Sequence, residues 1–193
     1  MTAALQVNEH VGDDAGQALA LSWLGQLAFD EGDFETAERL LTRSLLIRRR
    51  IRHMRGVVIT LISLGRVAAE RGQIDTAGRL LAEAEQLCRK RADRVGTAMI
   101  LAQQAQVEMA SGSPEKAVTT MSEALPMLVN VGGYGVAIAC ALRDLGEAQV
   151  LAGMAVLGGA TLAEAADGFD RSGYAEEAQR CRKLSSRSGR SDE

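Results

Sequence analysis

The sequence predicts an all-α fold, a right-handed solenoid of antiparallel helix pairs, and three observations lead to this expectation. Of the 193 residues, 47% are hydrophobic but only 3% are aromatic, so the apolar content is mainly of the kind that favours helices over strands. Apolar and small residues recur in one register every 40 to 41 residues. Glycines recur in the same register, where a helix C-terminus would need a left-handed residue.

The repeat is clearest in a Leu-Gly pair and in a single glycine seven residues after it. The Leu-Gly pair occurs in three of the four units, at residues 24–25, 64–65 and 145–146, and the third unit has Gln-Ala instead. The single glycine occurs in all four units, as Gly32, Gly72, Gly112 and Gly153. Agreement of independent columns indicates a repeat whose units bury their apolar faces by stacking.

Each unit is expected to contain two helices joined at this single glycine. Asp33 is a candidate N-cap for the second helix of unit one, and Ser113, which precedes a proline, marks a stronger helix start in unit three. Gly25 and Ala37 are expected where the two helices of a unit touch, because small side chains let helix axes approach closely. Ser44 is expected to face the next unit.

These columns resemble the tetratricopeptide repeat (TPR), a family of helix-pair arrays. The family pattern has a large residue, then Leu-Gly, and further on an alanine followed four positions later by a large apolar residue. Unit one matches it with Leu21, Leu24, Gly25, Ala37 and Leu41. The second helix lacks the usual terminal proline. This long form is similar to the repeats of kinesin light chains and to the C-terminal arrays of bacterial LuxR-type and signalling-ATPase regulators.

The resemblance divides the chain into three parts. Residues 3–12 are expected to be the end of a preceding repeat helix, residues 13–186 the TPR solenoid with about four helix pairs and a closing helix, and residues 187–193 a disordered tail. The first part either caps the array or is left from a longer protein. We favour the second interpretation, because capping helices usually differ from internal repeats.

The resemblance also implies that the first helix of each unit lines an inner groove for peptides or partner helices. The matching positions form rows, and the expected groove residues are Leu19, Ser22, Gln26, Phe29, Ile59, Ile62, Arg66, Met99, Gln106, Arg143 and Glu147. One row is apolar throughout and consists of Leu19, Ile59, Met99 and Cys140. That row is either ordinary helix packing, which is the interpretation that we favour, or an exposed strip for a partner or a second copy of the chain.

Arginines cluster near the predicted ends of the second helices. Residues 39–55 contain seven arginines and no acid, and four basic residues follow within residues 89–94. The candidate basic edge consists of Arg48, Arg49, Arg52, Arg55, Arg89 and Arg91. It would either bind phosphates or an acidic partner, or complement helix dipoles and pair with nearby acids. We favour the second interpretation. The few aromatic residues also offer little for base stacking, so sequence-specific single-strand binding is not expected.

The sequence contains no motif for catalysis, metal binding or cofactor binding. Cys88, Cys140 and Cys181 are too far apart for a metal or redox motif, so we expect reduced thiols in a cytoplasmic protein. No stretch is long and apolar enough to be a membrane span.

We therefore expect a non-enzymatic protein-interaction or peptide-sensing module within a larger bacterial transcriptional or signalling regulator, with no cofactor and no metal. Its expected partner is a protein or peptide, not a nucleic acid and not a membrane. The alternatives are self-association into a homo-oligomer and binding of a nucleic acid or an acidic partner along the basic edge.

Overall fold

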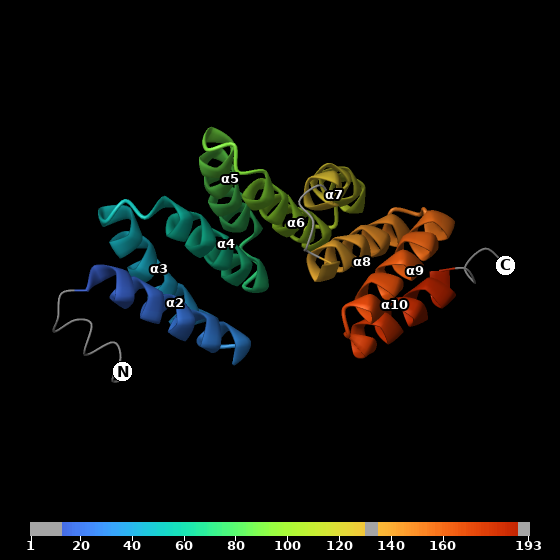
Figure 1. Cartoon of the computed structure of the whole chain (residues 1–193), viewed down its shortest axis with the longest axis horizontal. Helices are drawn as coiled ribbons and strands as arrows, with labels where there is room; N and C mark the ends of the chain where they lie inside the picture. Colours follow the sequence, from blue (N-terminus) through green and yellow to red (C-terminus); the bar gives the residue numbers. More distant parts are fainter. Residues whose placement is uncertain (1–12, 130–134, 189–193) are drawn as a thin grey trace. The chain divides into compact units, whose positions relative to one another are not determined.

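The computed structural model describes residues 13–129 and 135–188, which form nine α-helices and no strand (Figure 1). The helices are α2 (Asp14–Asp30), α3 (Phe34–Arg50), α4 (Met54–Glu70), α5 (Ile74–Lys90), α6 (Arg94–Ala110), α7 (Pro114–Val129), α8 (Gly135–Leu151), α9 (Ala155–Arg171) and α10 (Ala175–Ser188). The all-α fold of consecutive helix pairs is thus confirmed. The chain forms two compact units, one up to Ala92 and one from Asp93 onward.

The repeat consists of two equal halves. Helices α2 to α6 each have 17 residues, and their first residues lie 20 positions apart. Each is followed by a residue with positive φ, which is Gly32 (79°) after α2 and Arg52 (56°) after α3. The N–H of Gly32 donates to Phe29 O at 3.0 Å, and the next N–H donates to Ala28 O at 2.8 Å. This is the Schellman arrangement, which satisfies the last carbonyls of the helix.

The expected helix ends are confirmed in both directions. All four glycines of the repeating column have φ between 71° and 80°. The carboxylate of Asp33 accepts the N–H of Thr36 at 3.0 Å and so caps α3. Helix α7 begins at Pro114, directly after Ser113.

Small residues let the helices of a pair approach, as expected. A Cβ atom on Gly25 would lie 2.8 Å from the Cγ of Leu41 and 3.4 Å from the carbonyl oxygen of Ala37. Ser44 differs from the expectation, because its hydroxyl donates to Ala18 O at 2.7 Å on its own partner helix α2. A buried hydroxyl needs a hydrogen-bond partner, and the carbonyl on α2 supplies one.

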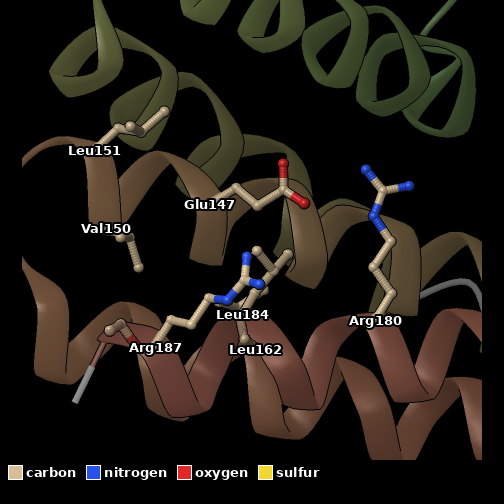
Figure 2. Close-up of a pocket in the computed structure, with 8 residues that line it drawn as sticks. Glu147, Val150, Leu151, Leu162, Arg180, Leu184 and Arg187 are labelled. Atoms are coloured by element: carbon tan, nitrogen blue, oxygen red, sulfur yellow. The ribbon is translucent and has the colours of Figure 1, made fainter. Parts of the chain in front are cut away.

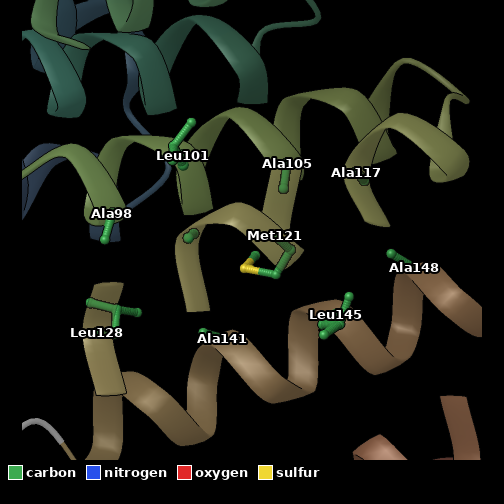
Figure 3. Close-up of a cluster of buried hydrophobic side chains, with 10 residues drawn as sticks. Ala98, Leu101, Ala105, Ala117, Met121, Leu128, Ala141, Leu145 and Ala148 are labelled. Carbon is green, nitrogen blue, oxygen red and sulfur yellow. The ribbon is translucent and has the colours of Figure 1, made fainter. Parts of the chain in front are cut away.

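In the second unit, the core forms between successive helices. Leu101 of α6, Met121 and Leu128 of α7 and Leu145 of α8 belong to one cluster of buried side chains (Figure 3). Alanines fill the remaining contact positions of this cluster, and they are Ala98, Ala105, Ala117, Ala124, Ala141 and Ala148. The chain can therefore build a close-packed core with few aromatic residues.

Both ends of the predicted solenoid reach the limits of the described residues. The segment 3–12, expected to be a preceding helix, lies outside them. The closing helix α10 continues to Ser188, two residues beyond the expected end at 186. The rest of the expected tail, residues 189–193, also lies outside the described part of the chain. No described helix is both long and apolar enough to cross a membrane.

Candidate functional site

The predicted groove residues lie on the first helices of the pairs. These helices are α2 and α4 in the first unit, which contact each other, and α6 and α8 in the second, which also touch. Leu19, Ile59 and Met99 of the apolar row are 52%, 53% and 52% exposed, and Cys140 is half-buried. The three large side chains are therefore not covered by packing within their own units.

In the first unit, the groove positions interact in small groups. The Arg66 guanidinium lies 4.6 Å from the centre of the Phe29 ring, a cation–π contact between α4 and α2. Gln26 donates to the carboxylate of Asp30 at 2.8 Å, in the last turn of the same helix. The hydroxyls of Ser22 and Ser44 are 2.8 Å apart. Ile62 is half-buried on α4.

In the second unit, three predicted residues line one pocket. Gln106 on α6 and Arg143 and Glu147 on α8 surround a volume of about 270 Å³. The other lining residues are Ala105, Met109, Asp144 and Arg180. The pocket therefore brings together three inner helices, α6, α8 and α10, and carries charges of both signs.

Arg143 is fixed by ion pairs on two helices. It donates to the Asp144 carboxylate at 2.8 and 3.0 Å and to Glu177 of α10 at 3.2 Å. Gln106 donates to the other oxygen of Asp144 at 2.8 Å. These bonds form a chain from α6 to α10, so Arg143 positions the pocket wall and has little freedom to meet a ligand.

The pKa values follow from this arrangement. Burial alone would lower the pKa of Arg143, but the charge of Asp144 and its hydrogen bonds outweigh burial and raise it. Burial raises the pKa of Glu147, against the opposing effect of Arg143. Among the described residues, no hydrogen bond or ion pair within the chain holds the Glu147 carboxylate, so it can accept one from a ligand.

The sequence interpretation missed two members of this pocket. Arg180 lies 40 residues after Cys140 and so continues the apolar row, but it falls in the closing helix, which was not assigned to the groove. Asp144 adjoins Arg143 in the sequence. Successive residues point about 100° apart around a helix, so Asp144 was not an evident partner for its neighbour.

The candidate basic edge, all in the first unit, is smaller than expected. Arg48 does not belong to it, because its side chain is buried against α4, where the guanidinium donates to Gly56 O at 2.8 Å. Burial also lowers the pKa of Arg48. Arg49 pairs with Glu83 at 2.5 Å and Arg89 with Glu85 at 2.7 Å. In the described part of the chain, the exposed members of the edge without an ion pair are Arg52, Arg55 and Arg91.

The described residues contain no cluster of three or more side chains suited to a metal ion. Cys88 and Cys181 are buried and Cys140 is half-buried, and none of the three forms a disulfide. Burial raises the pKa of Cys140 and Cys181, which keeps them in the less reactive thiol form. What the polar pocket offers is hydrogen bonds and charge for a bound segment.

Comparison with known proteins agrees with the helix-pair fold. A family model described as tetratricopeptide repeat matches residues 16–90. A search of curated proteins gives no match. Among solved structures, BtubC (BKLC) from P. vanneervenii is similar with a TM-score of 0.66 and 18% identity over 96% of this chain and 86% of that one. TPR-like repeats from Podosopora anserina are similar with a TM-score of 0.64 and 15% identity, over 88% of this chain and 93% of that one.

A larger protein also contains this fold. A signal transduction ATPase with numerous domains (STAND) and a tetratricopeptide repeat sensor, from Pyrococcus horikoshii, is similar with a TM-score of 0.75 and 18% identity. The match covers 94% of this chain but only 28% of that protein. At these identities the structural likeness shows the fold alone. The chain therefore resembles the tetratricopeptide repeat family over residues 16–90, and its helix pairs have a TPR-like fold.

Proposed function

We propose that the chain is a non-enzymatic protein-interaction module that binds a peptide segment in the polar pocket between α6, α8 and α10. The observation that carries this proposal is the convergence of Gln106, Arg143 and Glu147 on one pocket of about 270 Å³. Arg143 holds the wall in place through Asp144 and Glu177. Glu147 and the exposed Arg180 are the groups that would contact the peptide.

The polar groups of the pocket determine which hydrogen bonds a bound peptide can form. The Glu147 carboxylate accepts hydrogen bonds, and the Arg180 guanidinium donates them. A hydrogen bond to a charged group contributes about 1.5–3 kcal/mol. Loss of both groups therefore weakens binding by at least about tenfold, since tenfold corresponds to about 1.4 kcal/mol.

Selection from a phage library of random linear peptides tests the proposal. Selected peptides are titrated by fluorescence anisotropy against the wild type and against the double variant Glu147→Gln/Arg180→Ser. The control is Glu164→Gln/Arg171→Ser, which makes the same changes at two exposed positions of α9. We expect the first variant to lose at least tenfold in affinity and the control to bind like the wild type. Failure to select any peptide, or equal binding by both variants, would contradict the proposal.

The wider setting is also a proposal. We infer that the module is part of a larger cytoplasmic bacterial regulator, in which peptide binding would signal to another domain. The similarity to a repeat sensor within a STAND protein supports this setting at the level of fold. The test is the reading frame that surrounds this sequence in its gene. A flanking nucleotide-hydrolysing or DNA-binding domain is expected, and a frame that contains only the repeats would contradict the inference.

A further inference from the structure

The turn between α8 and α9 exposes a group of large apolar side chains. Leu151, Met154, Val156 and Leu157 are 68%, 42%, 76% and 53% exposed. They lie within seven consecutive residues, and no charged residue occurs from position 148 to position 163. Such a contiguous exposed group is typical of an interaction surface and not of a turn in water.

The chain supplies its own comparison, because three equivalent turns have the same backbone. The glycines of all four turns have φ between 71° and 80°. The residues that occupy the four positions are Asp30, Asp33, Glu35 and Thr36 in the first turn, Glu70, Gln73, Asp75 and Thr76 in the second, and Ala110, Ser113, Glu115 and Lys116 in the third. The fold therefore accepts polar residues at every one of these positions, so it does not require the apolar set in the fourth turn.

An apolar pocket lies beside this turn. It has a volume of about 360 Å³ and is lined by Val150 and Leu151 of α8, Leu162 of α9 and Leu184 of α10 (Figure 2). Leu151 belongs both to the pocket and to the exposed turn. The turn and the pocket thus form one continuous surface, with projecting apolar side chains next to an apolar hollow.

Charges of both signs surround this surface. Glu147, Arg180 and Arg187 line the polar part of the pocket (Figure 2). The surface therefore combines apolar side chains with one acid and two arginines. Two copies of it can meet without like-charge repulsion, whereas the first turn, with four acids in residues 30–35, would repel its own copy.

We infer that a second copy of this chain covers the surface, in a two-fold symmetric contact. In such a contact the same patch is used twice, so the exposed turn of each copy can enter the pocket of the other. Glu147 of one copy can then face Arg180 or Arg187 of its partner, so the dimer and a bound peptide would compete for Glu147 and Arg180. The inference goes beyond the proposed peptide binding, and it is tested without any peptide.

Sedimentation equilibrium of the wild-type chain across a wide concentration range tests the inference. The key variant replaces the fourth turn by the residues of the third: Leu151→Ala, Met154→Ser, Val156→Glu and Leu157→Lys. We expect a dimer for the wild type and an at least tenfold higher dissociation constant for this variant. Because the third turn has the same backbone with these residues, the variant should fold. Its helical circular dichroism should match the wild type, and so should its melting temperature at a concentration low enough for the wild type to be monomeric.

Two further variants locate the contact. Leu184→Ser replaces an apolar residue of the pocket by serine, the residue type at the equivalent position of α4, Ser63. This variant should also weaken the dimer. Trp23→Ser removes an apolar side chain that is 69% exposed on α2 in the other unit, and it should leave the dimer intact. The inference is overturned if the wild type stays monomeric at all concentrations, if the polar-turn variant dimerises as tightly as the wild type, or if only Trp23→Ser abolishes the dimer.

Discussion

Replacement of Gly158 by alanine should destabilise the second unit, although alanine occupies the same column in the other three helix pairs. A Cβ atom on Gly158 would lie 2.6 Å from Val150 Cγ2, 2.8 Å from Gly146 O and 2.9 Å from the Val150 nitrogen. Two of these three atoms belong to the backbone of α8. The helices α8 and α9 would therefore have to move apart, since no side-chain rotation relieves these two contacts.

The magnitude follows from two opposing effects. Insertion of a methyl group into a close-packed contact costs about 1–3 kcal/mol. Alanine in place of glycine within a helix contributes about 1 kcal/mol of stability. Because backbone atoms limit the relief at Gly158, we expect a net loss of about 1–2 kcal/mol. For a chain of this length, that lowers the melting temperature by about 2–8 °C.

Gly78 provides the matched control. It lies inside α5, and a Cβ atom there would have no neighbour within 4 Å. Gly78→Ala should therefore raise stability by up to about 1 kcal/mol through helix propensity alone. Melting is followed by far-ultraviolet circular dichroism, and hydrogen exchange of the α8 and α9 amides assigns the loss to the second unit. Our reasoning is refuted if Gly158→Ala melts at or above the wild type while Gly78→Ala is stabilised.

Three other predictions concern charge. Burial raises the pKa of Glu147, so its ionised form opposes folding. Glu147→Gln should therefore raise the melting temperature at pH 7. Calorimetry should show that this gain disappears below about pH 4.3, the ordinary glutamate pKa. Hydrogen bonds with Thr36 lower the pKa of Asp33. The contribution of Asp33 to stability is therefore present above the ordinary aspartate pKa and lost as the pH falls. Asp33→Ala should lower the melting temperature more at pH 7 than at pH 2. Duplex DNA titrated by anisotropy should show a salt slope no steeper than about −3, because only Arg52, Arg55 and Arg91 of the edge are exposed without an ion pair in the described part of the chain, and each neutralised phosphate contributes about −0.9. A steeper slope would show that further cations take part.

The sequence predicted the fold well because its main signals are local. A glycine at Gly32 and its equivalents marks a helix end through its own φ preference, and small residues in one column mark a close helix contact. The turns between pairs lacked such a signal. Arg52 and Ala92 have φ of 56° and 53°, although neither residue type favours positive φ. The equal halves of 20 residues were therefore visible only in the structure.

The site was predictable in position but not in interactions. Repeat register and the resemblance to TPR arrays together assigned Gln106 and Glu147 to a groove, and both residues line one pocket in the structure. It could not show that Arg48 folds back to a carbonyl on α4, since that depends on how one helix follows another across a turn. For the same reason it could not show that Ser44 bonds to its own partner helix. Long side chains reach several ångströms from their own row, so a column of positions does not determine their partners.

The pair α8–α9 differs from the other pairs in the residues where its two helices touch and in the exposed residues of its turn. Its contact column has glycine on both helices, Gly146 and Gly158, whereas the first two pairs have glycine on one helix only. Its turn is apolar where the other turns are polar. The two features can be separated by experiment. The polar-turn variant should lose dimerisation while the stability of its monomer is unchanged. Gly158→Ala should lose stability and, by moving α9 away from α8, should also shift the exposed Val156 and Leu157. A weakened dimer in both variants, with a lowered melting temperature in only one, would show that the close crossing positions this surface.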